Sequence, residues 1–188
     1  MNALDLLIAD HNRIRGLFAR FNAAKDADDT RTMVTLAGKI FDELAVHTTI
    51  EEEIFYPEVH DATEAVAETV DEGLQEHHVV EVLVHELGQI YGGSDEWVAK
   101  MAVLIENVEH HAEEEERELF PALRRRLAVE LDEMAAALDA RKAELGAPIL
   151  ADKIDLSKDQ LLDLARDQQI PGRSSMSHEE LAATVAPA

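Results

Sequence analysis

The sequence predicts an all-α protein, an antiparallel up-down four-helix bundle followed by a small C-terminal helical module. Apolar residues recur every three or four positions from Asn2 to about Gly146, the period of an amphipathic helix. Proline occurs in that stretch only at Pro57 and Pro121. The chain has 188 residues, 46% of them hydrophobic, which suffices for one globular domain with a small appendage.

Helix breaks divide the first 146 residues into elements of similar length. We expect breaks at Asp26 to Thr30, around Ala62, at Gly92-Gly93-Ser94 and at Gly146 to Pro148. Ser94 is expected to cap the helix that contains Trp97. At about 1.5 Å per residue, the first four helices span about 35 to 50 Å, as short-looped bundles require. The predicted helices cover residues 2–25, 31–60, 63–91, 94–127 and 128–145.

The tail differs in kind, and we divide the chain into a domain of residues 1–146 and a module of residues 152–188. Two short helical patterns, Ser157 to Gln168 and Ser177 to Val185, are joined by a Pro-Gly segment. A unit of about 35 residues is near the lower limit for independent stability. We therefore expect it either to dock on the bundle or to move on the linker from Gly146 to Ala151.

Charge and cysteine content exclude several classes of function. Forty Asp and Glu against 17 Lys and Arg give a net charge of -23, which repels phosphate backbones and anionic lipid, so neither nucleic acid nor a membrane is an expected partner. No cysteine is present, which excludes disulfides, thiolate zinc sites, iron-sulfur clusters and cysteine nucleophiles. Asp5 and Asp10 interrupt the apolar core that a signal peptide needs, so we expect a cytoplasmic protein.

An internal repeat contains the residues that are able to bind a metal or take part in catalysis. The segments that begin at His47 and His111 both read His, three residues, Glu-Glu, and then a hydrophobic-aromatic-Pro ending ten residues after the His. An acidic-His pair precedes each, Asp10-His11 in one case and Glu76-His77 in the other. The sequence therefore predicts two helical hairpins of one design, related by a pseudo-twofold axis.

Helical spacing places a His on the buried stripe of each of the four helices, and three of them add a Glu one turn later. A single core His is more often structural than a ligand, and a His-Glu pair is usually a surface pair. However, three buried carboxylates cost several kcal/mol each unless a cation compensates them. We therefore predict a metal cluster, with Glu116 as a substitute for Glu115 if that helix is rotated. The candidate ligands are His11, His47, Glu51, His77, Glu81, His111 and Glu115.

Other metal and catalytic motifs are absent from the sequence. It contains no Glu-x-x-His, which argues against a ferritin-type site, and no His-Glu-x-x-His of zinc proteases. Neither a Gly-Lys phosphate loop nor a Gly-x-Ser-x-Gly elbow occurs. We expect the remaining histidines to be non-ligands, namely His60, His78, His85, His110 and His178.

These motifs resemble the hemerythrin-like, His-His-Glu cation-binding domain, over residues 1 to about 127. The resemblance implies a four-helix bundle with two non-haem Fe ions joined by an oxo or hydroxo bridge. In that arrangement the four His of the candidate set are terminal ligands, while Glu51 and Glu115 bridge the irons. Oxygen-carrying hemerythrins have a His at the position of Glu81, and this departure predicts a third carboxylate ligand.

The resemblance also suggests a reaction. With Glu81 bound, one coordination position on the iron pair stays open for a small ligand such as H2O2, O2 or NO. A third carboxylate should stabilise the ferric state and disfavour reversible oxygen carriage. The leading hypothesis is a catalase-like reaction with hydrogen peroxide, as among actinobacterial relatives of the family. The alternative is sensing of O2, NO or iron, or iron storage, without turnover; copper and manganese, the reductant and the oligomeric state stay open.

The tail resembles a second motif, the N-terminal-like module of transcription termination factor Rho. The resemblance rests on Leu156 to Leu161, Ile170 to Ser174 and Met176 to Leu181. Such modules can contact nucleic acid in relatives. This one has seven acidic and four basic residues from Asp152 onward, so we expect a docking or interaction appendage instead.

Overall fold

The computed structural model describes residues 2–124, 126–146, 158–167, 172–176 and 181, and the described residues form helices and turns without strands, which confirms the all-α class. The helices of the main domain are α1 (Ala3–Asp26), α2 (Thr30–Ile50), α3 (Tyr56–Val59), α4 (Glu64–Leu87), α5 (Asp95–Glu114), α6 (Phe120–Arg124) and α7 (Ala128–Glu144). Short π-helical segments, Glu51–Phe55 and Glu115–Leu119, join α2 to α3 and α5 to α6, and a 3-10 turn covers His60–Ala62.

Side-chain caps fix the starts of the long helices. The Asn2 side chain accepts a hydrogen bond from the Asp5 amide, and the Asp5 carboxylate accepts one from the Asn2 amide. The Ser94 hydroxyl accepts from the Trp97 amide at 3.2 Å, which confirms the predicted cap of α5. Such caps satisfy amides that have no partner within the helix. The predicted breaks near residues 26–30, 62 and 92–94 are thus confirmed.

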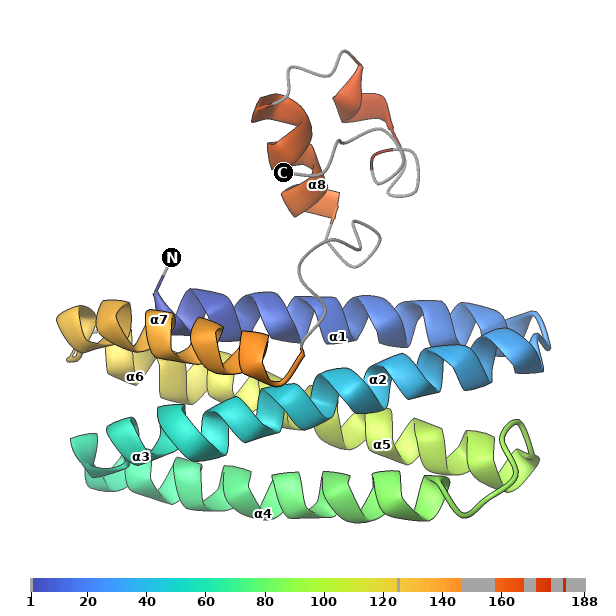
Figure 1. The fold of residues 1–188 in the computed structure, drawn as a ribbon, viewed down its shortest axis with the longest axis horizontal. Helices are drawn as coiled ribbons and strands as arrows, with labels where there is room; N and C mark the ends of the chain where they lie inside the picture. Colours follow the sequence, from blue (N-terminus) through green and yellow to red (C-terminus); the bar gives the residue numbers. More distant parts are fainter. Residues whose placement is uncertain (1, 125, 147–157, 168–171, 177–180, 182–188) are drawn as a thin grey trace.

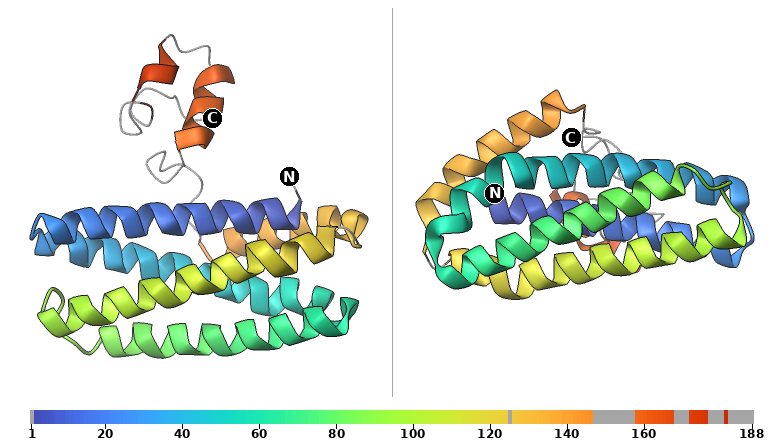
Figure 2. Two further views of the ribbon diagram at one scale, coloured as in Figure 1. Left: turned by 180° about the vertical axis from the view of Figure 1, so that it is seen from behind. Right: turned by 90° about the horizontal axis from the view of Figure 1, so that it is seen from below.

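The four long helices run antiparallel in chain order (Figures 1 and 2). α2 returns beside α1 and α5 returns beside α4, so each half of the sequence forms a helical hairpin. None of the described helices has a stretch long and apolar enough to cross a membrane.

A buried polar layer separates two apolar clusters along the bundle. The cluster at the end with α3 and α6 includes Leu7, Phe55 and Phe120. The cluster toward the α4–α5 loop includes Phe18 and Leu104. Both clusters exclude water from the layer between them, so any polar group in that layer must find its partner inside the protein.

α7 returns along the bundle and lies against α1 and α2 (Figure 1). Its buried residues Leu131, Met134 and Leu138 join the apolar cluster that contains Leu7. α7 is therefore a fifth structural helix of the main domain.

Only part of the predicted C-terminal module, residues 152–188, is described. α8 (Lys158–Asp167) agrees with the predicted helix at 157–168, and Arg173–Ser175 forms a 3-10 turn. Leu161, Ala165 and Leu181 form a small apolar cluster of their own. The linker 147–151, most of the predicted helix 177–185, and His178 lie outside the described residues.

Candidate metal centre

A π-helical turn follows each of the two repeated His-x-x-x-Glu units. The turns begin at Glu51 and Glu115, and in each the backbone amide five residues later donates to the carbonyl of that Glu. Pro57 and Pro121 follow these segments after one intervening residue, and a proline ring clashes with the carbonyl four residues earlier in a regular α-helix. The widened turns accommodate these rings and, as π-bulges often do, they lie at the candidate site.

Four buried imidazoles form two pairs in the polar layer. The Nε2 atoms of His11 and His47 lie 3.1 Å apart, and those of His77 and His111 are also 3.1 Å apart. All four residues are at most 6% exposed. The first pair comes from α1 and α2 and the second from α4 and α5, as the predicted pseudo-twofold relation requires.

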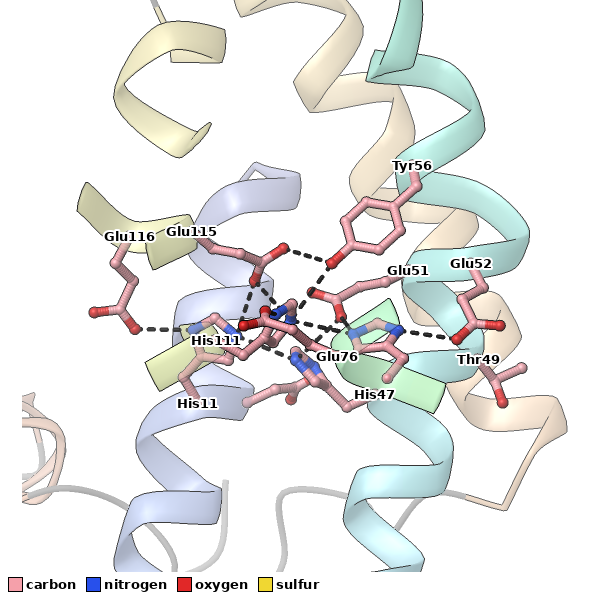
Figure 3. A network of polar contacts seen from close by, with 12 residues as sticks. His11, His47, Thr49, Glu51, Glu52, Tyr56, Glu76, His111, Glu115 and Glu116 are labelled. Carbon is pink, nitrogen blue, oxygen red and sulfur yellow. Dashed lines mark hydrogen bonds and ion pairs between the residues drawn. The ribbon is translucent and has the colours of Figure 1, made fainter. Parts of the chain in front are cut away.

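Each of two buried carboxylates connects the two His pairs (Figure 3). One oxygen of Glu51 lies 3.3 Å from Nε2 of both His47 and His77. One oxygen of Glu115 lies 3.3 Å from Nε2 of His11 and 3.8 Å from Nε2 of His111. Each carboxylate therefore faces one imidazole of either pair, which is the position of a bridging ligand.

The residues present fit a pair of metal ions. Ligand atoms bound at about 2.1 Å at right angles lie about 3 Å apart, close to the Nε2 separations. Glu51 is 0% exposed, yet neither of its oxygens has a hydrogen-bond partner among the described residues, and one oxygen of Glu115 has none either. Buried carboxylate oxygens without donors are costly, and a divalent cation would compensate them.

A second carboxylate lies behind each imidazole, at Nδ1. His11 and Glu116 are 2.8 Å apart, His77 and Glu52 2.9 Å, and His111 and Glu76 2.8 Å. Asp10 lies 3.8 Å from Nδ1 of His47. An Nδ1–H that donates to a carboxylate leaves Nε2 free to bind a metal and makes the imidazole more basic.

The sequence therefore encodes the inner and outer residues side by side. Each Glu-Glu pair supplies one bridging and one outer carboxylate, and each acidic-His pair supplies one imidazole and one outer carboxylate. Of the outer members, only Glu116 was a candidate from the sequence, as a substitute for the ligand Glu115, and no role was predicted for Asp10, Glu52 or Glu76. We call His11, His47, Asp10 and Glu116 the first half of the centre, and His77, His111, Glu52 and Glu76 the second half.

In the metal-free site, the buried ligands shift one another's pKa values. Burial lowers the pKa of His11, but the adjacent carboxylates of Glu115, at 3.3 Å, and Glu116, at 2.8 Å, outweigh it and raise the pKa to about 9. Burial, followed by repulsion from Glu115, raises the pKa of Glu51. Burial acts likewise on Glu115, but the neighbouring His111 and His11 lower its pKa overall. Protons thus take the place of metal cations in the cluster.

Tyr56 breaks the symmetry of the two halves. Its hydroxyl donates to Glu115 at 3.0 Å and lies 3.4 Å from Nε2 of His111, while the equivalent position in the other repeat is Phe120. Burial, and then the charges of Glu51 and Glu115, raise the pKa of Tyr56 well above its usual value, so the hydroxyl keeps its proton. Gly73 makes room for it, because a Cβ there would lie 3.0 Å from the Tyr56 oxygen.

The structure brings together six of the seven predicted ligands and corrects the seventh. The side chain of Glu81 is 82% exposed and lies 3.7 Å from His78 on the surface, away from the cluster. Val80, 6% exposed, takes the inward position one turn after His77. The expected non-ligands His60, His78, His85 and His110 are all outside the buried cluster, and Glu116 occupies an outer position.

A small apolar cavity adjoins all four imidazoles. Its volume is about 20 Å³, and Ile14, Phe18, Leu44, Val80 and Val108 form much of its wall. Arg15, Thr48 and Glu109 also line it. A space of this size accepts about one water-sized molecule.

Without Glu81 the ligand set is symmetric. Two imidazoles and one oxygen from each bridging carboxylate would give each ion four protein ligands. With the oxo or hydroxo bridge in place, each octahedral ion would then keep one position for a small ligand, so the pair would keep two instead of the single one expected when Glu81 was included.

Comparison with known proteins agrees with this geometry. The family model described as "Hemerythrin HHE cation binding domain" matches residues 2–123. A "DNA nickase" of Nostoc sp. (strain PCC 7120 / SAG 25.82 / UTEX 2576) is 27% identical over 146 residues, which are 77% of this chain but 40% of that protein. Uncharacterised proteins of Mycobacterium tuberculosis (strain ATCC 25618 / H37Rv) and Mycobacterium bovis (strain ATCC BAA-935 / AF2122/97) are 29% identical over 152 residues, which are 79% of this chain and 91% of theirs.

This chain therefore spans less than half of the Nostoc relative and nearly all of the mycobacterial ones. No solved structure is significantly similar to it. The match covers the four long helices, both π-helical turns and all six buried candidate ligands. The chain belongs to the hemerythrin HHE cation-binding domain family.

Proposed function

We propose that this protein is a non-haem di-iron protein that reacts with hydrogen peroxide in a catalase-like cycle. The observation that supports it most is the buried set of four Nε2 atoms and two bridging carboxylates, with orphaned carboxylate oxygens at its centre. Two irons held by these residues would supply a two-electron redox couple. One peroxide then takes up two electrons and two protons to give two waters, and a second peroxide returns two electrons and two protons as it becomes O2.

The outer carboxylates support the redox part of the proposal. Because Glu81 lies outside the cluster, a third carboxylate ligand no longer accounts for a low reduction potential. Outer carboxylates do so instead, since those bonded to Nδ1 of His11, His77 and His111 strengthen imidazole donation and stabilise the ferric state, while Asp10 lies 3.8 Å from Nδ1 of His47. A stabilised ferric state disfavours reversible oxygen carriage.

The cavity supports a small oxidant. Its volume of about 20 Å³ admits a molecule of a few atoms, and its apolar wall keeps bulk water from the imidazoles. Tyr56 adds a hydroxyl donor beside Glu115 in the second half. We expect this donor to fix the orientation of the Glu115 carboxylate.

We do not transfer the activity named for the Nostoc relative. This chain corresponds to only 40% of that protein, and its net charge of -23 opposes a DNA backbone. A cytoplasmic location, and a docking role for the C-terminal module, remain part of the proposal.

The test is iron per chain and the visible spectrum of protein purified in air, followed by O2 release after peroxide addition. About two irons and sustained O2 release are expected. The His77→Gln variant should lose iron and activity, whereas the neighbouring His78→Gln, whose side chain is 69% exposed, should keep both. Two irons without turnover would favour the sensing or storage function, and equal behaviour of the two variants would contradict the site.

A further inference from the structure

The two halves of the metal centre have nearly the same ligands but different surroundings. Both pairs of imidazoles are buried, and both face the same two bridging carboxylates. Besides the Tyr56 hydroxyl beside Glu115, the halves differ in what the four outer carboxylates contact on their far side, because only the first half contains cations there in the part of the chain that the structure describes.

In the first half, each outer carboxylate also meets a cation. Asp10, whose side chain is 3% exposed, binds both Arg13 of its own helix and Lys142 of α7. Nη1 of Arg15 lies 2.8 Å from the Glu116 oxygen that faces His11. Arg13 and Arg15 have further partners in Glu43 and Glu109, so three cations offset four carboxylates there.

In the second half, no Lys or Arg among the described residues forms an ion pair with Glu52 or Glu76. Glu76 instead shares its surroundings with Glu114 and His110, whose potential ligand atoms and its own lie within 4.8 Å of one another. Within the described ranges, no Lys or Arg therefore offsets the negative charge on this side.

The cations of the first half lower its metal affinity through two physical effects. A cation that binds an outer carboxylate withdraws electron density from it, which makes the imidazole it contacts a weaker donor. The same cation also repels a metal ion in the adjacent half through the low-dielectric interior. Both effects lower the metal affinity of the first half relative to the second.

We infer that the second half takes up the first metal ion and holds it more tightly, while Arg13, Arg15 and Lys142 weaken binding in the first half. The inference rests on the proposed metal centre but not on peroxide chemistry. It gives α7, which lies beyond the matched family residues, a role at the centre through Lys142 and Asp10. A one-metal chain is then the expected form when metal is scarce.

The test is a titration of the metal-free protein with Co²⁺ under nitrogen, in which binding is monitored by visible absorbance and, separately, by calorimetry. We expect two binding steps whose affinities differ by at least about tenfold. The His77→Gln variant should lose the tight step. The His11→Gln variant should keep the tight step and lose the weak one.

Substitutions at two neighbouring residues of α7 distinguish the effect of a cation at the metal centre from that of a change in net charge. Lys142→Met should raise the Co²⁺ affinity of the weak step and so reduce the difference in affinity between the two steps. Arg141→Met should leave this difference unchanged, because Arg141 pairs with the exposed Glu53. If Lys142→Met fails to fold by circular dichroism, Arg15→Gln makes the same test at a side chain that is 27% exposed.

Two equal steps, loss of the tight step in His11→Gln, or an unchanged difference in affinity in the Lys142 and Arg15 variants would overturn this inference and leave the metal centre standing. A wild-type chain that binds no Co²⁺ would overturn the metal centre itself.

Discussion

Metal binding at this centre should release protons, and the number can be worked out from the structure. His11 has a pKa of about 9, so at pH 7.5 about 97% of metal-free molecules hold its proton. A metal ligand must be deprotonated, so that proton leaves when Nε2 binds an ion. Glu51, whose pKa burial and Glu115 raise, contributes a further fraction. We expect about one to two protons per filled centre.

This release makes the apparent metal affinity depend on pH. For each proton displaced, the binding constant should rise about tenfold per pH unit until the pH passes the pKa of the group. For His11 that limit is about pH 9. Above it the imidazole is already neutral, and binding should no longer release its proton.

The assay is isothermal titration calorimetry of Zn²⁺ binding in HEPES and in PIPES, two buffers with different heats of ionisation. The difference in enthalpy between the buffers at pH 7.5 gives the protons released. A matched pair of titrations at pH 9.5, in two buffers suited to that pH, should show a release smaller by about one proton. Equal enthalpies at pH 7.5, or an unchanged release at pH 9.5, would refute the assignment of a protonated His11 in the metal-free protein.

Three further outcomes follow from the structure. The pKa of His11 is raised from 6.5 to about 9, so its protonation stabilises the metal-free fold fully below pH 6.5, and this stabilisation is lost as the pH rises through 9. The Tm of the metal-free protein should therefore fall between pH 6.5 and 9, whereas the Tm of the metal-loaded protein should not. Gly73→Ala should cost about 1 to 3 kcal/mol in urea unfolding and weaken metal binding, because its Cβ would lie 3.0 Å from Tyr56 and 3.3 Å from His111, whereas Gly38→Ala, with nothing within 4 Å, should not destabilise the protein. A truncated chain of residues 1–146 should keep the metal content and visible spectrum of the full chain, and a collapsed centre would contradict the division into two units.

Helical periodicity was sufficient to find the four imidazoles. Apolar residues fix which face of each helix is buried, and a His on that face is carried inward with them. The repeat then placed His47 and His111 at the same depth as each other, and likewise His11 and His77. Their convergence was therefore predictable before any distance was known.

Periodicity could not decide which residue points inward one helical turn after each buried His, because that residue can be either three or four positions later. After His77 the candidates are Val80 and Glu81, and burial favours the apolar side chain, so Val80 is 6% exposed and Glu81 points outward. After His47, by contrast, Ile50 and Glu51 are both 0% exposed where the π-helical turn begins. A spacing of four therefore had different outcomes in α2 and α4.

The π-helical turns were the part of the site that spacing rules missed. A constant 3.6-residue period turns Tyr56 away from the stripe of His47 and Glu51, but the wide turn brings both Phe55 and Tyr56 inside. Pro57 and Pro121, at the same distance after each repeated His, were the available signal. Their clash with a regular helix predicts a local widening at both ligand positions.

The outer carboxylates should lower the reduction potential of the metal centre, and Glu76 is the one at which this effect can be measured. Glu76 accepts from Nδ1 of His111 at 2.8 Å with no Lys or Arg partner among the described residues, so its charge acts on that imidazole undiminished. In Glu76→Gln the imidazole becomes a weaker donor and the ferric state loses stabilisation.

The reduction potential of the iron-loaded Glu76→Gln variant should therefore rise, as measured by redox titration of the visible spectrum. Glu72→Gln, an exposed change on the same helix one turn earlier, is the matched control and should leave the potential nearly unchanged. A fall in the potential of Glu76→Gln, or an equal rise in both variants, would show that general surface charge and not the imidazole contact sets the potential. The low-potential basis for peroxide chemistry would then have to come from the bridging carboxylates alone.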